Sequence, residues 1–312
     1  MNKPKNHHYI PETYLKSFSN HQKQLYQFRK DYKKFRLVSI AQICYEPNYF
    51  KINDTDLLKI FKIDDPNYIE KEYFKKQENN FQSLLKKLVQ PGFNHFEISL
   101  SEISLFLETI LTIKKRNPFH KSRIISAYKE YIKSEKFEED SKLGVEISRQ
   151  VDNFNPEIFI EKYIEEIQSS KEKQSDFFLQ FFLDKSENRT NLWTNLLLEF
   201  KIFILHAPAY KPFITTDNPG FTKLPNGEGL PFGGFGLDFE FFFPLTPQCC
   251  LCINKNQKDE NGKLIISKKI FRKNVDADVV NMINTYSFFL SEKKVFSYTK
   301  ESIESVARNL IN

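Results

Sequence analysis

Residues 99–118 read SLSEISLFLETILTIKKRNP, and this stretch decides the class of fold. Ser99 and Glu102 have the spacing of a capping box, in which the two side chains satisfy backbone donors at the start of a helix. The following residues are apolar on nearly every side, three basic residues suit the C-terminal helix dipole, and Pro118 ends the pattern. The stretch therefore predicts a helix over residues 100–116 that lies at the centre of the protein.

Helical patterns continue on both sides of this stretch, over a block spanning residues 65–205. Upstream, Asp65-Pro66 is a cap followed by proline at the first helical position, and Pro91-Gly92 closes that helix. Downstream, three further helices are predicted, at about 119–134, 156–170 and 175–200.

Both ends of the chain read as strands and turns. A β-hairpin is predicted in residues 1–60, where residues 25–29 and 35–40 alternate around a polar break. After residue 207 the pattern predicts helices near 275–285 and 300–311, and short strands at 213–216, 239–243, 250–253, 264–266 and 288–290. We find no repeat, linker or sharp change in composition, so one domain is expected over residues 1–312. The predicted class is α+β, with N- and C-terminal strands sharing one mostly antiparallel sheet and the helical block inserted between them.

Composition places the chain among ordinary globular proteins. It has 312 residues, of which 40% are hydrophobic and 28% charged. The net charge of +6 favours an anionic partner, although the lysine surplus of an AT-rich genome would give the same figure. No apolar stretch reaches about 18 residues and no apolar segment follows the N-terminal charges, so neither a membrane span nor a secretory signal is predicted.

The four cysteines lack the pattern of a metal site or a disulfide framework. Cys249, Cys250 and Cys252 form one run, and Cys44 stands alone. No pair has the C-x₂-C spacing of a zinc ribbon, so no zinc–cysteine site is predicted. Free cysteines indicate a reducing compartment, and we expect the protein in the cytoplasm.

Glu78 is the first candidate for chemistry. It shares a helical face with Phe74, Phe81 and Leu85, which places a carboxylate in an apolar seam. A buried carboxylate needs a partner or a cavity, because an unpaired buried charge is costly. The alternative is a one-residue difference in helical phase, which would leave Glu78 at the rim.

A second candidate lies in TTDNPG at residues 215–220, directly after an apolar strand. Asp217 at a strand end is interpreted either as an orienting carboxylate or metal ligand, or as the former of an Asx turn. Asn218 is held away from helical geometry by the proline that follows it.

Two basic groups complete the set. In the extended pair His7-His8, adjacent side chains point to opposite faces, so only one enters a given cleft and the alternative is a solvated pair. Arg116, at the end of the apolar helix, suits a bidentate clamp on phosphate or carboxylate. A helix-dipole partner is the alternative role for Arg116.

The predicted hairpin is rich in basic and aromatic residues. Charge combined with stacking surfaces suits single-stranded nucleic acid, whereas a solvated hairpin explains the same composition. The candidate nucleic-acid-binding residues are Arg29, Lys30, Lys33, Lys34 and Arg36.

Several of these segments resemble one known family. Residues 7–18, HHYIPETYLKSF, are similar to the opening QHYVPxxYLxxF signature of the microbial domain-of-unknown-function family 4238. That pattern has Gln where this chain has His7, so His8 is the matching histidine. The resemblance continues in order along the chain through Glu78, Arg116-x-Pro118, FITTDNP at 213–219, FPLTP at 243–247 and Asn281-x-x-Asn284. The family brings no established activity, and the resemblance implies only that the five polar residues His8, Glu78, Arg116, Asp217 and Asn218 recur in its motifs.

A histidine, two carboxylates and an arginine brought together would form a hydrolytic or phosphoryl-handling site. The leading hypothesis is a phosphodiester-cleaving hydrolase, a nuclease that acts as an effector in microbial defence or as a toxin. In it His8 serves as general acid and base, Asp217 and Glu78 orient it or hold a divalent cation, and Arg116 stabilises the phosphate. Two alternatives remain: a non-catalytic binding or sensor module for an anionic ligand or nucleic acid, and a polar network that fixes the fold. No membrane partner is expected.

Overall fold

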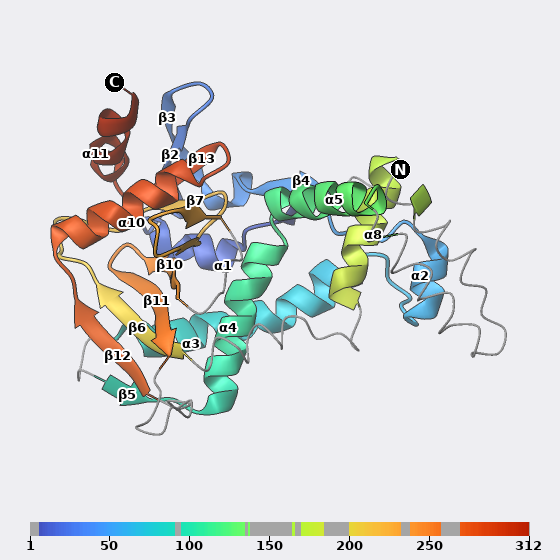
Figure 1. Ribbon diagram of the computed structural model, residues 1–312, viewed down its shortest axis with the longest axis horizontal. Helices are drawn as coiled ribbons and strands as arrows, with labels where there is room; N and C mark the ends of the chain where they lie inside the picture. Colours follow the sequence, from blue (N-terminus) through green and yellow to red (C-terminus); the bar gives the residue numbers. More distant parts are fainter. Residues whose placement is uncertain are drawn as a thin grey trace. The chain divides into compact units, whose positions relative to one another are not determined.

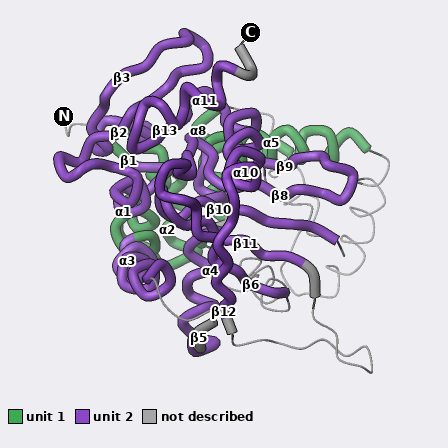
Figure 2. The backbone as a smooth tube through the Cα atoms, turned by 90° about the vertical axis from the view of Figure 1, so that its left-hand side faces the viewer, with its two compact units in different colours: residues 1–7, 47–74, 118–187 green, residues 8–46, 75–117, 188–312 purple. Residues whose placement is uncertain are grey.

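The computed structural model describes residues 6–90, 95–134, 137, 164–165, 170–183, 200–231, 238–256 and 269–311. The chain divides into two compact units that alternate along the sequence, coloured separately in Figure 2. Unit 1 comprises residues 1–7, 47–74 and 118–187, and unit 2 comprises residues 8–46, 75–117 and 188–312. The single-domain organisation stays a prediction.

Unit 1 is mainly helical in its described residues, which also include part of β1 (Asn6–His8) and the end of β4 (Tyr45–Pro47). It contains α2 (Thr55–Ile60), the π-helical turn Ile69–Phe74, α5 (Pro118–Ile132) and α8 (Lys171–Leu183). Asp54 caps α2 by accepting hydrogen bonds from two backbone N–H groups. Aromatic side chains make its core, with Phe50, Phe74 and Phe182 meeting edge to face at centroid distances of 4.8 to 6.2 Å.

Unit 2 contains a seven-stranded sheet in the order β5-β12-β6-β11-β10-β8-β9, of which Figure 1 labels β5, β12, β6, β11 and β10. All of its pairings are antiparallel except the parallel pair β12–β6. The strands are β5 (His95–Glu97), β6 (Phe200–His206), β8 (Phe221–Lys223), β9 (Gly229–Leu230), β10 (Glu240–Thr246), β11 (Cys249–Asn256) and β12 (Lys269–Asn274). Their apolar runs reflect burial on both faces.

A second, four-stranded sheet of unit 2 joins distant parts of the chain. Its order is β3-β2-β13-β7, and all its pairs are antiparallel. The N-terminal hairpin β2 (Gln24–Arg29) and β3 (Lys34–Ser39) pairs through β2 with β13 (Lys294–Ser297), which pairs in turn with β7 (Thr215–Thr216). A two-stranded sheet is formed by β1 (Asn6–His8) and β4 (Tyr45–Pro47).

Helix α10 (Ala277–Phe289) packs against both large sheets. Its Val280 and Ile283 join a core with Phe242, Cys250 and Cys252 of the seven-stranded sheet. Its Phe288 joins the core of the four-stranded sheet, together with one face of α11 (Lys300–Ile311). The cysteine run thus supplies small apolar side chains to a sheet face.

The opposite face of β10 meets the N-terminal helices. Tyr14 of α1 (Glu12–Leu15) lies 5.4 Å from the Phe243 ring, measured between centroids. Phe81 of α3 (Lys75–Val89) stacks on Phe106 of α4 (Leu100–Lys115) at 5.8 Å. Helix α4 therefore lies inside unit 2, and its C-terminus is fixed by packing on several sides.

The structure confirms the α+β class, and several elements agree with the sequence prediction. Helix α4 begins at the predicted capping box of Ser99 and Glu102, and α5 begins at Pro118. The N-terminal hairpin is present and pairs with β13, which follows α10. The strands nevertheless divide among three sheets where one was predicted.

Two other predictions are corrected. Residues 288–290, predicted as a strand, form the end of α10, and the strand lies at 294–297 instead. The predicted helical block contains strands β5 and β6, because packing between two strands decides the conformation of a short apolar run. The predicted helix at 156–170 and strand at 264–266 fall largely or wholly outside the described residues, as does most of 175–200. None of the helices in the described part of the chain is long and apolar enough to cross a membrane.

Candidate functional site

The five predicted site residues all belong to unit 2, and His8 lies at its first strand. Its imidazole is mostly buried, with 16% of the side chain exposed, and it contacts the Tyr45 ring edge-on at 5.6 Å. Burial lowers the pKa of His8, while the charge of Glu12 and a hydrogen bond to the Ala41 backbone act against this shift. Burial therefore favours the neutral form of the His8 imidazole.

Glu12, the first residue of α1, follows His8 by four residues and was not predicted as a site residue. Its Oε1 is 3.4 Å from Nε2 of His8, and 45% of its side chain is exposed. Nε2 itself has almost no exposed surface and makes no hydrogen bond that meets normal geometry among the described residues. A solvent-facing carboxylate thus covers a buried imidazole nitrogen. The i, i+4 spacing of the two residues was the only signal of this pair in the sequence.

Glu78 and Arg116 form the second part of the site. Nη1 and Nη2 of Arg116 both donate to Oε1 of Glu78, each at 3.0 Å. Nε of Arg116 donates to the Tyr9 carbonyl at 3.2 Å, and Thr13 Oγ1 donates to the other carboxylate oxygen at 3.3 Å. Arg116 is 2% exposed and Glu78 25%. Glu78 is thus at once a paired carboxylate and close to the rim of the apolar seam.

His8 and this ion pair interact electrostatically. The charge of Arg116 lowers the pKa of His8 and the charge of Glu78 raises it, both more weakly than burial does. The Tyr9 carbonyl held by Arg116 belongs to the residue directly after His8. Three of the predicted residues are therefore brought together, with Glu12 and Thr13 beside them.

Asp217 lies in a different polar network. Its carboxylate accepts backbone N–H groups of Glu292, Lys293 and Lys294 at 2.8 to 3.0 Å. Burial raises the pKa of Asp217 to about 6, and these three hydrogen bonds oppose the shift. The carboxylate does not form a local Asx turn. It fixes the turn that precedes β13.

Asn218 is tied to the end of α4. Its Oδ1 accepts a hydrogen bond at 2.6 Å from the buried ammonium of Lys114, which also donates to the Gly220 carbonyl. Asn117 donates from its side-chain amide to the Asp217 carbonyl. Lys114 and Asn117, which were not predicted, flank Arg116 in sequence. The C-terminus of α4 consequently joins the two polar networks, one through Arg116 and the other through its neighbours.

The predicted nucleic-acid-binding residues divide into two groups. Lys30 donates to the carbonyls of Phe288 and Ser291 at 3.1 and 2.9 Å and so satisfies the C-terminus of α10. Arg29 pairs with Asp31 and lies over the Tyr32 ring. Lys33, Lys34 and Arg36 are exposed around the turn and on β3.

Metal-binding geometry is not found in the described part of the chain. There, no group of three or more His, Cys, Asp or Glu side chains is arranged to hold a metal ion. All four cysteines are free and buried, and burial raises the pKa of the Cys249 thiol to about 11. The site residues described above act through hydrogen bonds and ion pairs.

Comparison with known proteins gives one match. The model of a family described as "Protein of unknown function (DUF4238)" matches residues 6–301, nearly the whole chain. No curated protein and no solved structure matches it.

Proposed function

The chain belongs to the DUF4238 family, and we propose that it is a phosphodiester-cleaving hydrolase, a nuclease that acts on RNA. The observation that carries the proposal is the pair formed by His8 Nε2 and Glu12 Oε1, 3.4 Å apart. A neutral buried imidazole beneath an exposed carboxylate is a pair suited to proton transfer.

RNA is the substrate proposed because it carries its own nucleophile, the 2′-hydroxyl. The Glu12 carboxylate takes the 2′-hydroxyl proton and shares it with Nε2 of His8. The 2′-oxygen then bonds to phosphorus, and the bond from phosphorus to the 5′-oxygen breaks as that oxygen takes a proton from solvent. The products are a 2′,3′-cyclic phosphate and a 5′-hydroxyl, and the proton held by the pair returns to solvent.

The other polar residues position this pair. Arg116 donates to the Tyr9 carbonyl and to Glu78, and Glu78 accepts from Thr13, so the chain that follows His8 is fixed. Asp217 and Asn218 fix their own loop against α4 and β13. They therefore support the His8–Glu12 pair only indirectly, through the position of α4. In this proposal Lys33, Lys34 and Arg36 bind the phosphate backbone. A cytoplasmic location and a role in defence or as a toxin belong to the same proposal.

The test is cleavage of a labelled single-stranded RNA by the purified full-length chain, with the matched DNA as a second substrate. We expect RNA to be cut to 2′,3′-cyclic phosphate ends and DNA to remain intact. His8→Ala and Glu12→Gln should each lower the rate by about 10²–10⁴-fold, the usual contribution of acid–base catalysis, with little change in melting temperature. His21→Ala, at an exposed turn of the same unit, is the control that keeps full activity. Cleavage that survives both site variants would refute the proposal.

A binding module is the second candidate. Arg116 and Asp217 are engaged in buried hydrogen bonds within the protein, which favours this alternative. The exposed basic residues among those predicted are then Lys33, Lys34 and Arg36 of the hairpin. Under this alternative the wild-type chain binds RNA and returns it uncut at any protein concentration. The same cleavage assay, run beside a filter-binding assay, separates the two functions.

A further inference from the structure

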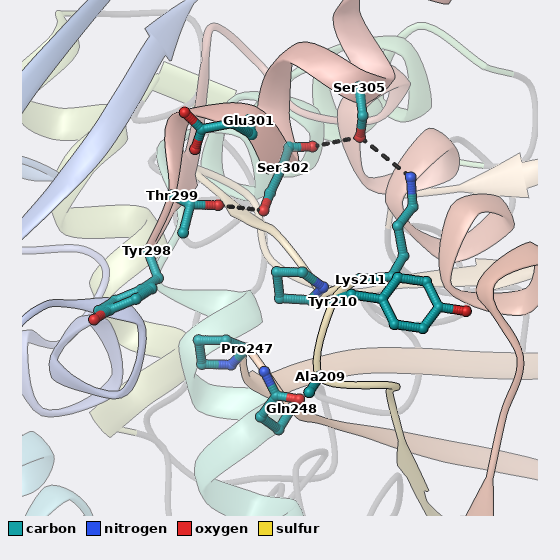
Figure 3. Close-up of a pocket in the computed structure, with 11 residues that line it drawn as sticks. Ala209, Tyr210, Lys211, Pro247, Gln248, Tyr298, Thr299, Glu301, Ser302 and Ser305 are labelled. Carbon is teal, nitrogen blue, oxygen red and sulfur yellow. Dashed lines mark hydrogen bonds between the residues drawn. The ribbon is translucent and has the colours of Figure 1, made fainter.

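A cavity of about 490 Å³ lies in unit 2, away from the polar networks described above. It opens between the start of α11 and two loops, residues 209–212 and 247–248. Tyr298 and Tyr210 lie to either side of Pro247 in the view of Figure 3. None of the predicted site residues lines it.

The two tyrosines are the reason to assign this cavity a ligand. Tyr210 is 79% exposed and Tyr298 49% exposed. Among the described residues neither makes a ring contact or a side-chain hydrogen bond. The two exposed rings border the same cavity, and tyrosine is enriched where one protein binds another.

The walls of the cavity are held by hydrogen bonds within the protein. The Phe213 N–H donates to the Pro247 carbonyl at 2.8 Å, and the Ala207 N–H donates to the Gln248 carbonyl at 2.9 Å. On the helix side Thr299 Oγ1 and Ser302 Oγ are 2.5 Å apart. A preformed site of this kind costs little ordering entropy when a ligand binds.

The charges at the cavity balance. Its one ammonium, Lys211, donates to Ser305 Oγ at 3.3 Å, and its one carboxylate, Glu301, is exposed at the rim. Single-stranded nucleic acid requires a positively charged groove, which this cavity lacks. Grooves lined by aromatic side chains are instead the surface that recognises proline-rich peptides.

We propose that this cavity binds a proline-rich peptide segment of a partner protein in the polyproline II conformation. Proline rings of the peptide pack on Tyr210 and Tyr298. The backbone carbonyls of such a helix make no internal hydrogen bonds, so they are free to accept from the side-chain amide of Gln248. An arginine flanking the prolines pairs with Glu301, which selects the orientation of the peptide.

The test is isothermal titration of the full-length chain with synthetic peptides. The peptides carry proline at every third position, the repeat of the polyproline II helix, with arginine at one end or the other. Their matched controls replace each proline with alanine. We expect binding of at least one proline peptide, loss of binding with its alanine control, and about tenfold weaker binding for Tyr210→Ala and Tyr298→Ala.

Two further variants sharpen the result. Tyr32→Ala removes a tyrosine that is 62% exposed on the hairpin and should bind as wild type. Glu301→Gln should reduce the preference for the arginine-flanked peptide over an arginine-free one. The proposal is overturned if neither peptide orientation binds, if the alanine controls bind equally, or if both cavity variants retain full affinity. Capture of single-stranded RNA by Tyr210 and Tyr298, without peptide binding, would also overturn it and assign the cavity to nucleic acid.

Discussion

Arg116 donates from both terminal nitrogens to a single oxygen of Glu78, and its third nitrogen holds the Tyr9 carbonyl. The guanidinium is 2% exposed, so it depends on these partners for its solvation. The arginine therefore cannot clamp a phosphate without giving up Glu78. The pair of Arg116 and Glu78 therefore has a structural role. It holds the N-terminal signature, residues 7–18, against α3 and α4.

The first prediction follows from this pair. Glu78→Gln leaves a buried cation without its counter-charge and should lower the free energy of unfolding by about 3 kcal/mol, measured by urea denaturation. The double variant Glu78→Gln/Arg116→Met removes the unpaired charge and should recover part of that loss. Lys59→Met breaks an exposed pair with Asp56 and serves as the control, with a change of about 0.5 kcal/mol. Equal losses for the buried and exposed pairs would contradict the structural role.

The second prediction concerns the pKa of His8. Burial lowers it and the charge of Glu12 raises it, so Glu12→Gln should lower it further. Titration of the ring protons by NMR, with His8→Ala to assign the signal, measures the shift. Because burial holds the pKa of His8 in the folded chain below its ordinary value of 6.5, the unfolded chain binds the proton more readily, and the free energy of unfolding falls as pH falls below 6.5. An unchanged pKa in Glu12→Gln would show that the two groups do not interact, and an upward shift would contradict the assigned direction.

Local signals predicted some of these features well. The capping box of Ser99 and Glu102 lies within four residues, so the sequence contains the whole interaction, and it is present in the structure. The alternation of apolar and polar residues in the hairpin predicted β2 and β3 for the same reason, because the two strands are adjacent in the sequence. Residues 288–290 were predicted as a strand but end α10. At this helix end Phe288 is buried and the next residue, Phe289, is exposed, which is the alternation typical of a strand.

The candidate site shows where such signals fail. The three N–H groups that bind Asp217 come from residues 292–294, and Lys114 reaches Asn218 across 104 residues. No local pattern in a single sequence connects segments so far apart. The sequence therefore left both interpretations of Asp217 open, the orienting carboxylate or metal ligand and the former of an Asx turn. His8 and Arg116 were selected by residue type and by resemblance, whereas Glu12 is four residues from His8 and was within reach of spacing alone.

The third prediction uses the pKa of Asp217, which burial raises from its ordinary value of 3.8 to about 6. Between these values the folded chain holds a proton that the unfolded chain releases, so the free energy of unfolding falls as pH rises through this window. The change is roughly 3 kcal/mol in total. Asp217→Asn should abolish this pH dependence of the free energy of unfolding. The variant also loses acceptors for the N–H groups of residues 292–294, so it should melt earlier at every pH. Thermal denaturation of both proteins from pH 3.5 to 7 measures the difference, and parallel curves would show that Asp217 does not titrate in that range.

The last prediction separates the two groups of hairpin cations. Neutralising Lys33, Lys34 and Arg36 together, as glutamines, should weaken binding to single-stranded RNA and reduce the slope of log affinity against log salt by about 2, since each phosphate contact contributes about 0.7. The melting temperature should stay unchanged, because these side chains are exposed. Lys30→Gln should behave in the opposite way: its ammonium satisfies carbonyls at the end of α10, so its loss should lower the melting temperature and leave the salt slope nearly unaltered. Filter binding at several salt concentrations, together with calorimetry, measures both quantities. If the triple variant keeps the wild-type salt slope, the hairpin is a solvated surface and RNA is bound elsewhere.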